Sequence, residues 1–228
     1  MAALAAPPVS SPALAPPPVA PSNPGPADNA LETPDMAFSA ALRQAIGAPA
    51  RADLGDQATE RLDEDLLIVP KAPAARLLTA ANREVPADFV ALLLGPDGMD
   101  MPGVIRFVPV GFVDANAALA WSADDFMASL EDTVERRNPD RVARNLEERS
   151  ARRWVAPPKY DPETHQISWA ALILPKTAPR ESDGEITFHA IAFGREGYIA
   201  LTMVTSVQKA DAVGHMVDVF LAGLNFRP

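Results

Sequence analysis

The residues of this chain that could do chemistry are mainly aromatic and polar side chains in its C-terminal half. Aromatic rings that converge with a few polar groups typically line a groove for a small ligand. These residues predict such a groove, used by a small-molecule binder or an enzyme. The alternative is that the rings only pack Pro157 and Pro158 against a sheet, and the sequence leaves both alternatives open. The candidate binding residues are Trp154, Pro158, Tyr160, Asp161, Trp169 and Arg195.

A metal site is a weaker hypothesis, and it falls near the C-terminus. Asp211, His215 and Asp218 are spaced so that one helix face would carry two carboxylates and an imidazole. That face lies opposite the apolar stripe of the same helix, where a solvated surface belongs. His165 and His189 fall in a turn and a strand, and nothing in the spacing brings the three histidines together. We expect no metal ligand set and no cofactor.

Catalytic motifs are missing from the sequence. The chain has no cysteine, which excludes a thiol nucleophile, a disulfide framework and a zinc–thiolate site. It has no Gly-x-Ser-x-Gly elbow, Walker loop, dinucleotide-binding fingerprint or His-Glu-x-x-His pair. The sequence therefore assigns no catalytic residue and favours a non-catalytic protein, without specifying an activity.

The charge of the chain argues against a nucleic acid as partner. The formal net charge is -10 and the sequence pI is about 4.7, so the body of the protein repels phosphates and anionic lipid headgroups. The run Gly194-Arg-Glu-Gly197 resembles the loop with which KH domains clamp an RNA backbone. That loop joins two helices, whereas this run lies between two predicted strands, so we interpret it as a hairpin turn.

A stretch rich in arginine, residues 136–153, alternates basic with acidic side chains. Pairs such as Asp132/Arg136, Asp140/Arg144 and Glu148/Arg152 have the spacing of ion pairs along a helix. The stretch predicts a solvated, salt-bridged surface. The functional alternative is a docking surface for an acidic partner or for lipid phosphates.

Helix and turn signals locate the elements of the first half. Thr33–Pro34 predicts a helix start, after which Phe38, Leu42 and Ile46 follow at helical spacing until Gly47. Other expected elements are a hairpin around Gly55–Asp56, strands at 66–69, 89–94 and 104–110, a helix at 73–81, and turns at 95–98 and 102–103.

The second half of the sequence predicts two helical segments, a β-meander and a final helix. Ser122 and Asp125 match a capping box, and Phe126, Leu130 and Val134 form the apolar stripe of the helix that follows. Both faces of the strand at 198–205 are largely apolar, so we expect it to be central and covered on both sides. The remaining elements are a short helix after 138–139, a turn at 161–162, strands at 166–174 and 185–193, and a helix at 211–224.

Together these elements predict an α+β fold, a mainly antiparallel sheet flanked by helices. Residues 1–30 are rich in Ala and Pro, which favours an extended, disordered tail. We therefore expect two regions, a tail at 1–30 and one α+β domain at 31–228.

Four runs of the sequence are similar to a bacterial family of uncharacterised membrane-anchored proteins, the domain-of-unknown-function family 2167. The most specific run extends from Trp154-Val-Ala-Pro-Pro-Lys-Tyr-Asp161 to Trp169-Ala170. The resemblance covers about residues 36–228, and the family assigns no activity, cofactor or catalytic residue that could be transferred. The order of elements also resembles the PsbP-type α/β/α sandwich. The other three runs are Leu54-Gly-Asp-Gln-Ala-Thr59, Gly111-Phe-Val-Asp114 and Phe193-Gly-Arg-Glu-Gly197.

The resemblance implies an exported domain held at a membrane by C-terminal helices, and this chain departs from that pattern. It ends at Pro228 without the expected anchor, and Arg153 stands where the family usually has a glycine. No apolar run reaches the ~18–20 residues that cross a bilayer. The N-terminus lacks a complete secretory signal, although Ala2–Ala6 matches either the end of one or plain tail.

We therefore expect a non-catalytic domain of the periplasm or cell envelope that binds a protein or another envelope component. The cytoplasm is the alternative compartment, and the small-molecule binder or enzyme is the alternative function. The identity of the partner, the oligomeric state and any attachment to a membrane lie beyond what the sequence indicates.

Overall fold

The computed structural model describes residues 33–62, 66–95, 98–113 and 122–227, so the predicted tail at 1–30 lies outside the described residues. The helices are α1 (Pro34–Leu42), α2 (Lys71–Ala80), α3 (Ala123–Arg136), α4 (Asn138–Ala143) and α5 (Ala210–Gly223), with short 3-10 turns at Glu181–Asp183 and Val207–Lys209. The strands are β1 (Ile46–Gly47), β2 (Ala50–Leu54), β3 (Ala58–Leu62), β4 (Leu67–Pro70), β5 (Phe89–Gly95), β6 (Gly98–Val108), β7 (Arg149–Asp161), β8 (Gln166–Pro175), β9 (Glu185–Phe193), β10 (Tyr198–Ser206) and β11 (Leu224–Phe226).

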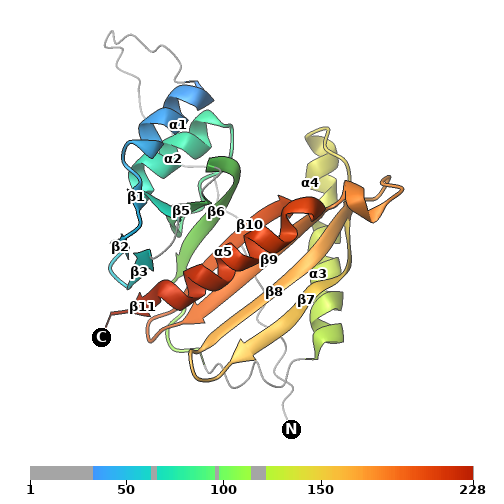
Figure 1. The fold of residues 1–228 in the computed structure, drawn as a ribbon. Helices are drawn as coiled ribbons and strands as arrows, with labels where there is room; N and C mark the ends of the chain where they lie inside the picture. Colours follow the sequence, from blue (N-terminus) through green and yellow to red (C-terminus); the bar gives the residue numbers. More distant parts are fainter. Residues whose placement is uncertain (1–32, 63–65, 96–97, 114–121, 228) are drawn as a thin grey trace, which may run out of the picture. The chain divides into compact units, whose positions relative to one another are not determined.

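Eight strands form one antiparallel sheet in the order β1-β4-β5-β6-β10-β9-β8-β7 (Figure 1). The meander from β8 to β10 has the predicted boundaries to within a residue. The predicted central position of β10 is confirmed, because β6 pairs with one of its sides and β9 with the other. The predicted cover on both faces is not, because its residues alternate between buried and half-buried. A separate three-stranded sheet has the order β11-β3-β2.

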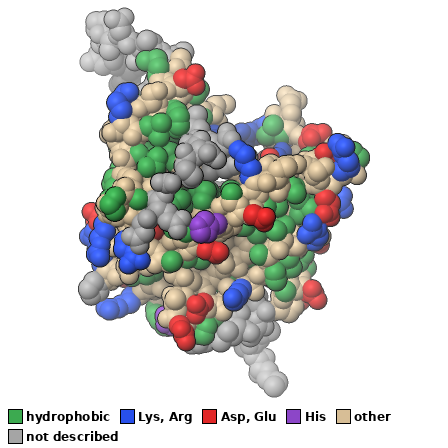
Figure 2. All heavy atoms as spheres, viewed as in Figure 1, with side chains coloured by type: hydrophobic (Ala, Val, Ile, Leu, Met, Phe, Trp, Pro, Cys, Tyr) green, Lys and Arg blue, Asp and Glu red, His purple; other side chains and the backbone are tan. Residues whose placement is uncertain are grey.

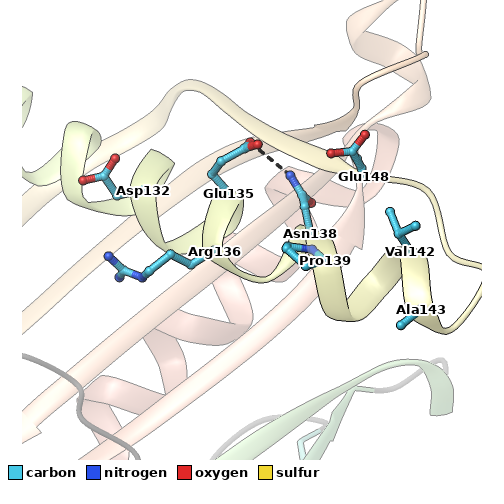
Figure 3. A pocket seen from close by; sticks show the side chains of 8 residues that line it. All are labelled: Asp132, Glu135, Arg136, Asn138, Pro139, Val142, Ala143 and Glu148. Atoms are coloured by element: carbon cyan, nitrogen blue, oxygen red, sulfur yellow. Dashed lines mark hydrogen bonds between the residues drawn. The ribbon is translucent and has the colours of Figure 1, made fainter.

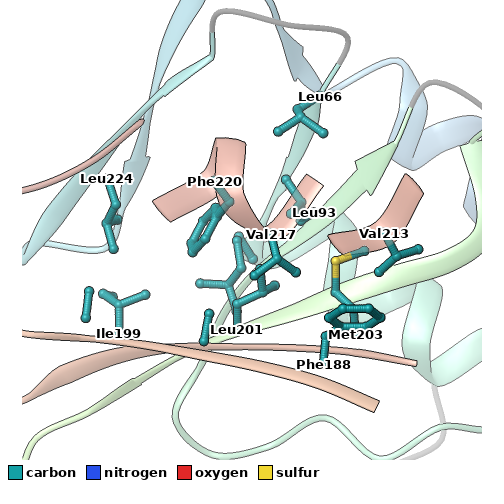
Figure 4. Packing of buried hydrophobic residues seen from close by; sticks show 14 of the residues in the cluster. Leu66, Leu93, Phe188, Ile199, Leu201, Met203, Val213, Val217, Phe220 and Leu224 are labelled. Carbon is teal, nitrogen blue, oxygen red and sulfur yellow. The ribbon is translucent and has the colours of Figure 1, made fainter. Parts of the chain in front are cut away.

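Helix α5 covers one face of the large sheet and supplies much of the main core (Figure 1). Its buried residues Val213, Val217 and Phe220 pack over Leu201 and Met203 of β10 (Figure 4). The sequence places these apolar residues one helical turn apart, which is why a single face of the helix is buried. Strands β2, β3 and β11 close the same core, to which Leu54 and Leu62 contribute.

The opposite face of the sheet carries the other helices at its two ends. Helices α1 and α2 pack on Val69, Leu92 and Leu94 of β4 and β5. Helix α3 packs on the far end, over Ala151 of β7 and Ile173 of β8. Successive side chains of a strand point to opposite faces. Leu93 and Leu172, which alternate with the residues under α2 and α3, belong to the core beneath α5. Helices therefore flank both faces of a mainly antiparallel sheet, and the predicted α+β fold class is confirmed.

The local signals at turns and caps are confirmed. The Ser122 hydroxyl accepts a hydrogen bond from the amide of Asp125 at 3.1 Å and so begins α3. The hairpin between β2 and β3 turns at Gly55, whose φ of 64° is a conformation that favours glycine. At the turn between β7 and β8, the Asp161 carboxylate accepts from the amide of Glu163 at 2.9 Å.

Strand β7 lies at one end of the large sheet and is irregular along its length. Its pairing with β8 shifts register at three places, between Ala151 and Arg153, between Trp154 and Ala156, and between Ala156 and Lys159. Such bulges bend an edge strand and interrupt its hydrogen-bond ladder. The last shift spans Pro157 and Pro158, which have no amide hydrogen to donate.

Three local predictions were wrong. The first helix ends at Leu42, and Ile46 belongs to β1; Ala37 and Ala41 make the buried stripe, while Leu42 is 37% exposed. Small residues pack α1 closely on α2, and of the predicted stripe Phe38 packs beside them as a partly buried residue.

The second error concerns Gly103, which lies inside β6 rather than in a turn. A side chain at this position would come within 2.8 Å of Leu201 Cδ1. The glycine therefore serves a close contact between strands rather than a reversal of the chain.

The third error concerns Arg149 to Arg153, which belong to β7 and not to a helix. Glu148 and Arg152 consequently do not form a helical pair. Arg149 instead forms an ion pair with Glu185 on β9, and Arg153 forms one with Glu181 at 2.8 Å. Cross-strand partners replaced the helical ones that spacing alone indicated.

Candidate functional site

The middle strands of the large sheet present two unequal faces. In β9 and β10 every second residue is buried under α5, and the residues between them are only half-buried. On the opposite face α2 packs on β4 and β5 and α3 packs on β7 and β8, so that β6, β10 and β9 lie between these helices. We call the half-buried residues of these strands the open strip: Arg106, Val108, Thr187, His189, Ile191, Phe193, Tyr198, Ala200, Thr202 and Val204.

A row of rings joins the open strip to α3. Phe126 of α3 stacks on Trp154 of β7 with ring centroids 5.9 Å apart, and it meets the edge of Trp169 of β8 at 5.0 Å. Trp169 in turn stacks on the His189 ring of β9 at 5.0 Å. The indole Nε1 of Trp154 donates to the carbonyl of Ala123 at 3.2 Å, which fixes the start of α3 over the row. Trp154 and Trp169, both predicted from the sequence as site residues, are therefore connected by their contacts with Phe126 of α3.

A second row of rings crosses the sheet near the β9–β10 turn. Tyr160 of β7 lies 6.4 Å from Phe193 of β9, and Phe193 lies 6.1 Å from Tyr198 of β10, measured between ring centroids. The Tyr160 hydroxyl shares a 3.1 Å hydrogen bond with His165 Nδ1. Burial raises the pKa of the Tyr198 hydroxyl, which therefore stays neutral in this row. The row is aromatic, and the charged side chains of Arg106 and Asp88 lie near Tyr198 at one end of it.

His189 is the titratable group at the centre of the open strip. Its Nδ1 shares a 3.2 Å hydrogen bond with the Thr202 hydroxyl, while Trp169 stacks on its ring. Burial, and to a lesser extent the positive charge of Arg137, lowers the pKa of His189 from 6.5 to about 4. The imidazole is therefore neutral at pH 7, and it is a weak base for proton transfer there.

This pKa predicts an acid sensitivity that can be assigned to one residue. Between pH ~6.5 and ~4, His189 is protonated in the unfolded chain but stays neutral in the folded chain. The contribution of the neutral imidazole to the free energy of unfolding is therefore complete above pH ~6.5 and is lost as the pH falls. The expected loss reaches up to about 3 kcal/mol near pH 4. Urea unfolding at pH 7, 5.5 and 4.5, with an NMR titration of the ring, measures it.

The matched variant for this prediction is His189→Gln, which can still hydrogen-bond Thr202 but cannot ionise. Its free energy of unfolding should depend less on pH between ~6.5 and ~4 than that of the unmodified protein. An NMR midpoint for His189 near 6.5, or equal acid sensitivity of the two proteins, contradicts the prediction.

One charged pair lies in the open strip, and its charges cancel. The Arg106 guanidinium of β6 donates from Nε to Asp88 Oδ1 at 2.7 Å and from Nη2 to Asp88 Oδ2 at 2.5 Å. This bidentate geometry is the strongest form of arginine–carboxylate pairing. Arg106 is therefore held in place and supplies no uncompensated charge to a ligand.

The other sequence-predicted residues do not join these rows. Pro158 is half-buried in the irregular part of β7, and the Asp161 carboxylate is engaged by the backbone of its own turn. Arg195 is exposed in the β9–β10 turn, whose Gly197 has a φ of 155° and would place a Cβ 2.1 Å from the Val108 carbonyl oxygen. The turn is a structural hairpin, as the sequence indicates.

Sequence reasoning missed His189, Thr202 and Arg106 as members of a site. The signal was present in the alternation of β9, where Ile186 and Phe188 share one face and Thr187 and His189 share the other. Read as a two-faced strand, the segment indicates that the histidine lies opposite the α5 core.

The sequence offered the face of α5 with Asp211, His215 and Asp218 as a candidate for metal ligands. Among the described residues, no three side chains of His, Asp or Glu come together in a way that could hold a metal ion. Acidic and basic side chains are interspersed over the face that carries α5 (Figure 2). This is the pattern of a solvated surface.

A separate surface hollow lies where α3 meets α4 (Figure 3). The buried side chain of Asn138 holds the junction: its amide nitrogen donates to Glu135 Oε2 at 3.0 Å and to the Arg149 carbonyl at 2.9 Å. The hollow contains none of the aromatic residues of the two rows. Its lining residues are Asp132, Glu135, Arg136, Asn138, Pro139, Val142, Ala143 and Glu148.

Comparison with protein families identifies the chain. The model of a family described as proteins of unknown function, DUF2167, matches residues 47–228. The chain belongs to the DUF2167 family. The match contains every strand of the large sheet except the first residue of β1, and it contains all residues of the open strip. The sequence resemblance is therefore confirmed, and the DUF2167 description itself assigns no function.

Two further comparisons add little to the family assignment. No curated protein matches this DUF2167 member in sequence. The solution structure of cyanobacterial PsbP (CyanoP) from Synechocystis sp. PCC 6803 matches with a TM-score of 0.46 and 11% identity, over 80% of this chain and 95% of that chain. None of the described helices combines the length and the hydropathy needed to cross a membrane.

Proposed function

We propose that this chain is a non-catalytic binding domain of the cell envelope and that the open strip is the surface on which it holds a protein partner. One observation carries the proposal. Strands β9 and β10 are buried on the α5 face, where Phe107 of β6 is partly buried, yet on the other face the three middle strands keep a row of half-buried residues between α2 and α3. Half-buried, partly apolar residues that lie side by side offer a surface on which a partner can pack and complete their burial.

The chemistry of the open strip supports binding rather than catalysis. His189 is neutral and engaged with Thr202, and Arg106 is neutralised by Asp88. Neither is therefore poised as an acid, a base or a free cation near neutral pH. Tyr198 and Phe193 offer rigid, partly apolar rings, which are enriched at protein interfaces.

The assignment to the envelope, with the periplasm as the compartment, is supported by the N-terminal segment. Residues 1–30 are rich in Pro and Ala, a composition typical of an extended spacer that holds a domain at a distance from its point of attachment. A spacer of this kind suits a domain that reaches a partner across an envelope.

Site-specific photo-crosslinking tests the function. A photo-reactive residue replaces Ala200 in the open strip and, as the matched control, Ala222 on the exposed side of α5. We expect the Ala200 position to capture one protein species from envelope fractions and the Ala222 position not to capture it. Excess unmodified domain should compete the product away.

Two outcomes would contradict the proposal. If both positions give the same products, or if Ala200 gives none, the open strip is not a protein-binding surface. If instead small metabolites alone protect Ala200 from labelling, the chain is a small-molecule binder acting through Trp154, Tyr160, Asp161 and Trp169, the alternative that the sequence left open.

A further inference from the structure

We propose that the partner docks as a basic amphipathic helix laid along the open strip between α2 and α3. This inference rests on the proposed function and specifies the partner's chemistry. It follows from the width of the strip, the shape of its floor and the charge of its wall, each taken from the described residues.

The width of the strip fits one helix. Helix α2 lies over β4 and β5, and α3 lies over β7 and β8, with β6, β10 and β9 between them. Neighbouring strands are ~4.8 Å apart, so the two helix positions are separated by about five strand spacings, or ~24 Å. Packed helices lie ~8–10 Å apart, so among the described elements the spacing between α2 and α3 corresponds to one further helix.

The floor of the strip is lowest along its middle strand. There β10 presents the small side chains of Ala200 and Thr202. The neighbouring strands present larger ones, with Arg106 paired opposite Ala200 on one side and His189 paired opposite Thr202 on the other. Small residues beneath larger flanks let a helix approach the sheet closely and bury its apolar side chains.

Helix α3 forms one wall of the open strip, and part of its apolar surface remains accessible. Its apolar residues Phe126, Met127, Leu130 and Val134 are packed on the sheet, yet none of them is fully buried. Helix α5 buries Val213, Val217 and Phe220 in the same molecule. The apolar stripe of α3 is therefore only partly covered by its own domain, and an adjacent helix would complete its burial.

The charge of the same wall selects a basic partner. Helix α3 contains five exposed acidic residues and one arginine. One of these acids, Glu135, is paired with Lys176, and the positive charge of Arg137 at the end of the helix acts on His189. The acidic surface of the wall is therefore that of Asp124, Asp125, Glu131 and Asp132. The whole chain carries a formal net charge of -10. Charge complementarity mainly sets specificity and the rate of association, so a lysine-rich polar face is expected on the docking helix.

Synthetic 18-residue peptides, a length chosen to give about five helical turns, test this inference. One is an amphipathic helix with a leucine/alanine face and a lysine face, one carries glutamate in place of lysine, and one has the lysine composition in scrambled order. A proline-rich peptide and anionic phospholipid vesicles are tested in parallel as alternative ligands of the open strip. Binding is followed by tryptophan fluorescence and by NMR shifts of Ala200 and Thr202.

We expect the lysine helix to bind at least about tenfold more tightly than every other probe, with an affinity that falls as salt rises. Ala200→Arg, which fills the floor, should weaken it about tenfold or more, whereas Ala222→Arg on α5 should leave it unchanged. The double variant Glu131→Lys/Asp132→Lys, at exposed positions of α3, should remove the preference for lysine over glutamate, and circular dichroism checks that it is folded.

Equal binding of the lysine and glutamate helices overturns the inference, and so does tighter binding of the scrambled peptide, the proline-rich peptide or the vesicles. An unchanged affinity after both Ala200→Arg and the double reversal also overturns it. These outcomes leave the photo-crosslinking at Ala200 to decide the proposed function separately, because that experiment presupposes no helix and no charge in the partner.

Discussion

Phe220→Ala is expected to lower the free energy of unfolding by about 3–5 kcal/mol. The ring is 1% exposed and lies in the main core, where α5 meets the large sheet and the strands of the small sheet (Figure 4). Removing it takes away the apolar contacts of a whole ring and leaves a cavity that the surrounding strands cannot fill by shifting. Urea denaturation followed by circular dichroism measures the loss.

The matched control is Val142→Ala on α4, because Val142 is 55% exposed. This substitution should change stability by no more than about 0.5 kcal/mol. If Phe220→Ala costs less than about 1.5 kcal/mol, α5 is not docked on the sheet in the way that the structure describes.

Removing the chain through Leu54 is expected to destroy cooperative folding, whereas removing residues 1–30 should change the melting temperature little. The longer deletion eliminates α1, β1 and β2, and with them Ala52 and Leu54 of the main core and Ala37 and Ala41 of the α1–α2 cluster. Loss of these fully buried residues should cost several kcal/mol, a large fraction of the ~5–15 kcal/mol that stabilises a typical domain.

The first thirty residues are expected to be dispensable for a different reason. Their composition offers too little apolar surface to offset roughly 1–2 kcal/mol of backbone ordering entropy per residue. Thermal melts of the two truncated proteins, with limited proteolysis and mass analysis of the full chain, measure both effects. Protease protection between Pro7 and Pro26, or a marked loss of stability without residues 1–30, would move the domain boundary toward the N-terminus.

Much of the fold could be predicted because its local signals agree with its tertiary structure. The capping pair Ser122 and Asp125, the glycine turn at Gly55 and the proline turn after Asp161 each act within a few residues. The alternation of β9 and β10 and the spacing of apolar residues along α5 report burial directly. These patterns were sufficient for an antiparallel sheet flanked by helices.

The errors arose where distant residues decide the local structure. Arg149 reads as helical from its charged neighbours, but pairing with β8 and the ion pair to Glu185 place it in a strand. Gly103 reads as a turn, although its role is to let Leu201 approach from the neighbouring strand. Neither contact is visible within a short window of sequence.

The candidate site was predicted in part. Trp154, Tyr160 and Trp169 do lie on one face of the sheet, but His189 and Thr202 join them only because β8, β9 and β10 are neighbours in register. No spacing along the chain shows that Trp169 pairs with His189 or that His189 pairs with Thr202. Strand order and register, which sequence patterns alone do not determine, assemble the open strip.

The irregular edge of the large sheet has a consequence for how the domain behaves when it is crowded. Consecutive strand residues direct their amides to opposite sides, so one of the adjacent prolines at 157 and 158 removes a donor from the outer edge of β7. The register shifts and the exposed charges of Arg152 and Lys159 further break up that edge. Another molecule therefore finds no continuous template at this edge on which to add a strand, which disfavours edge-to-edge association when many copies lie close together.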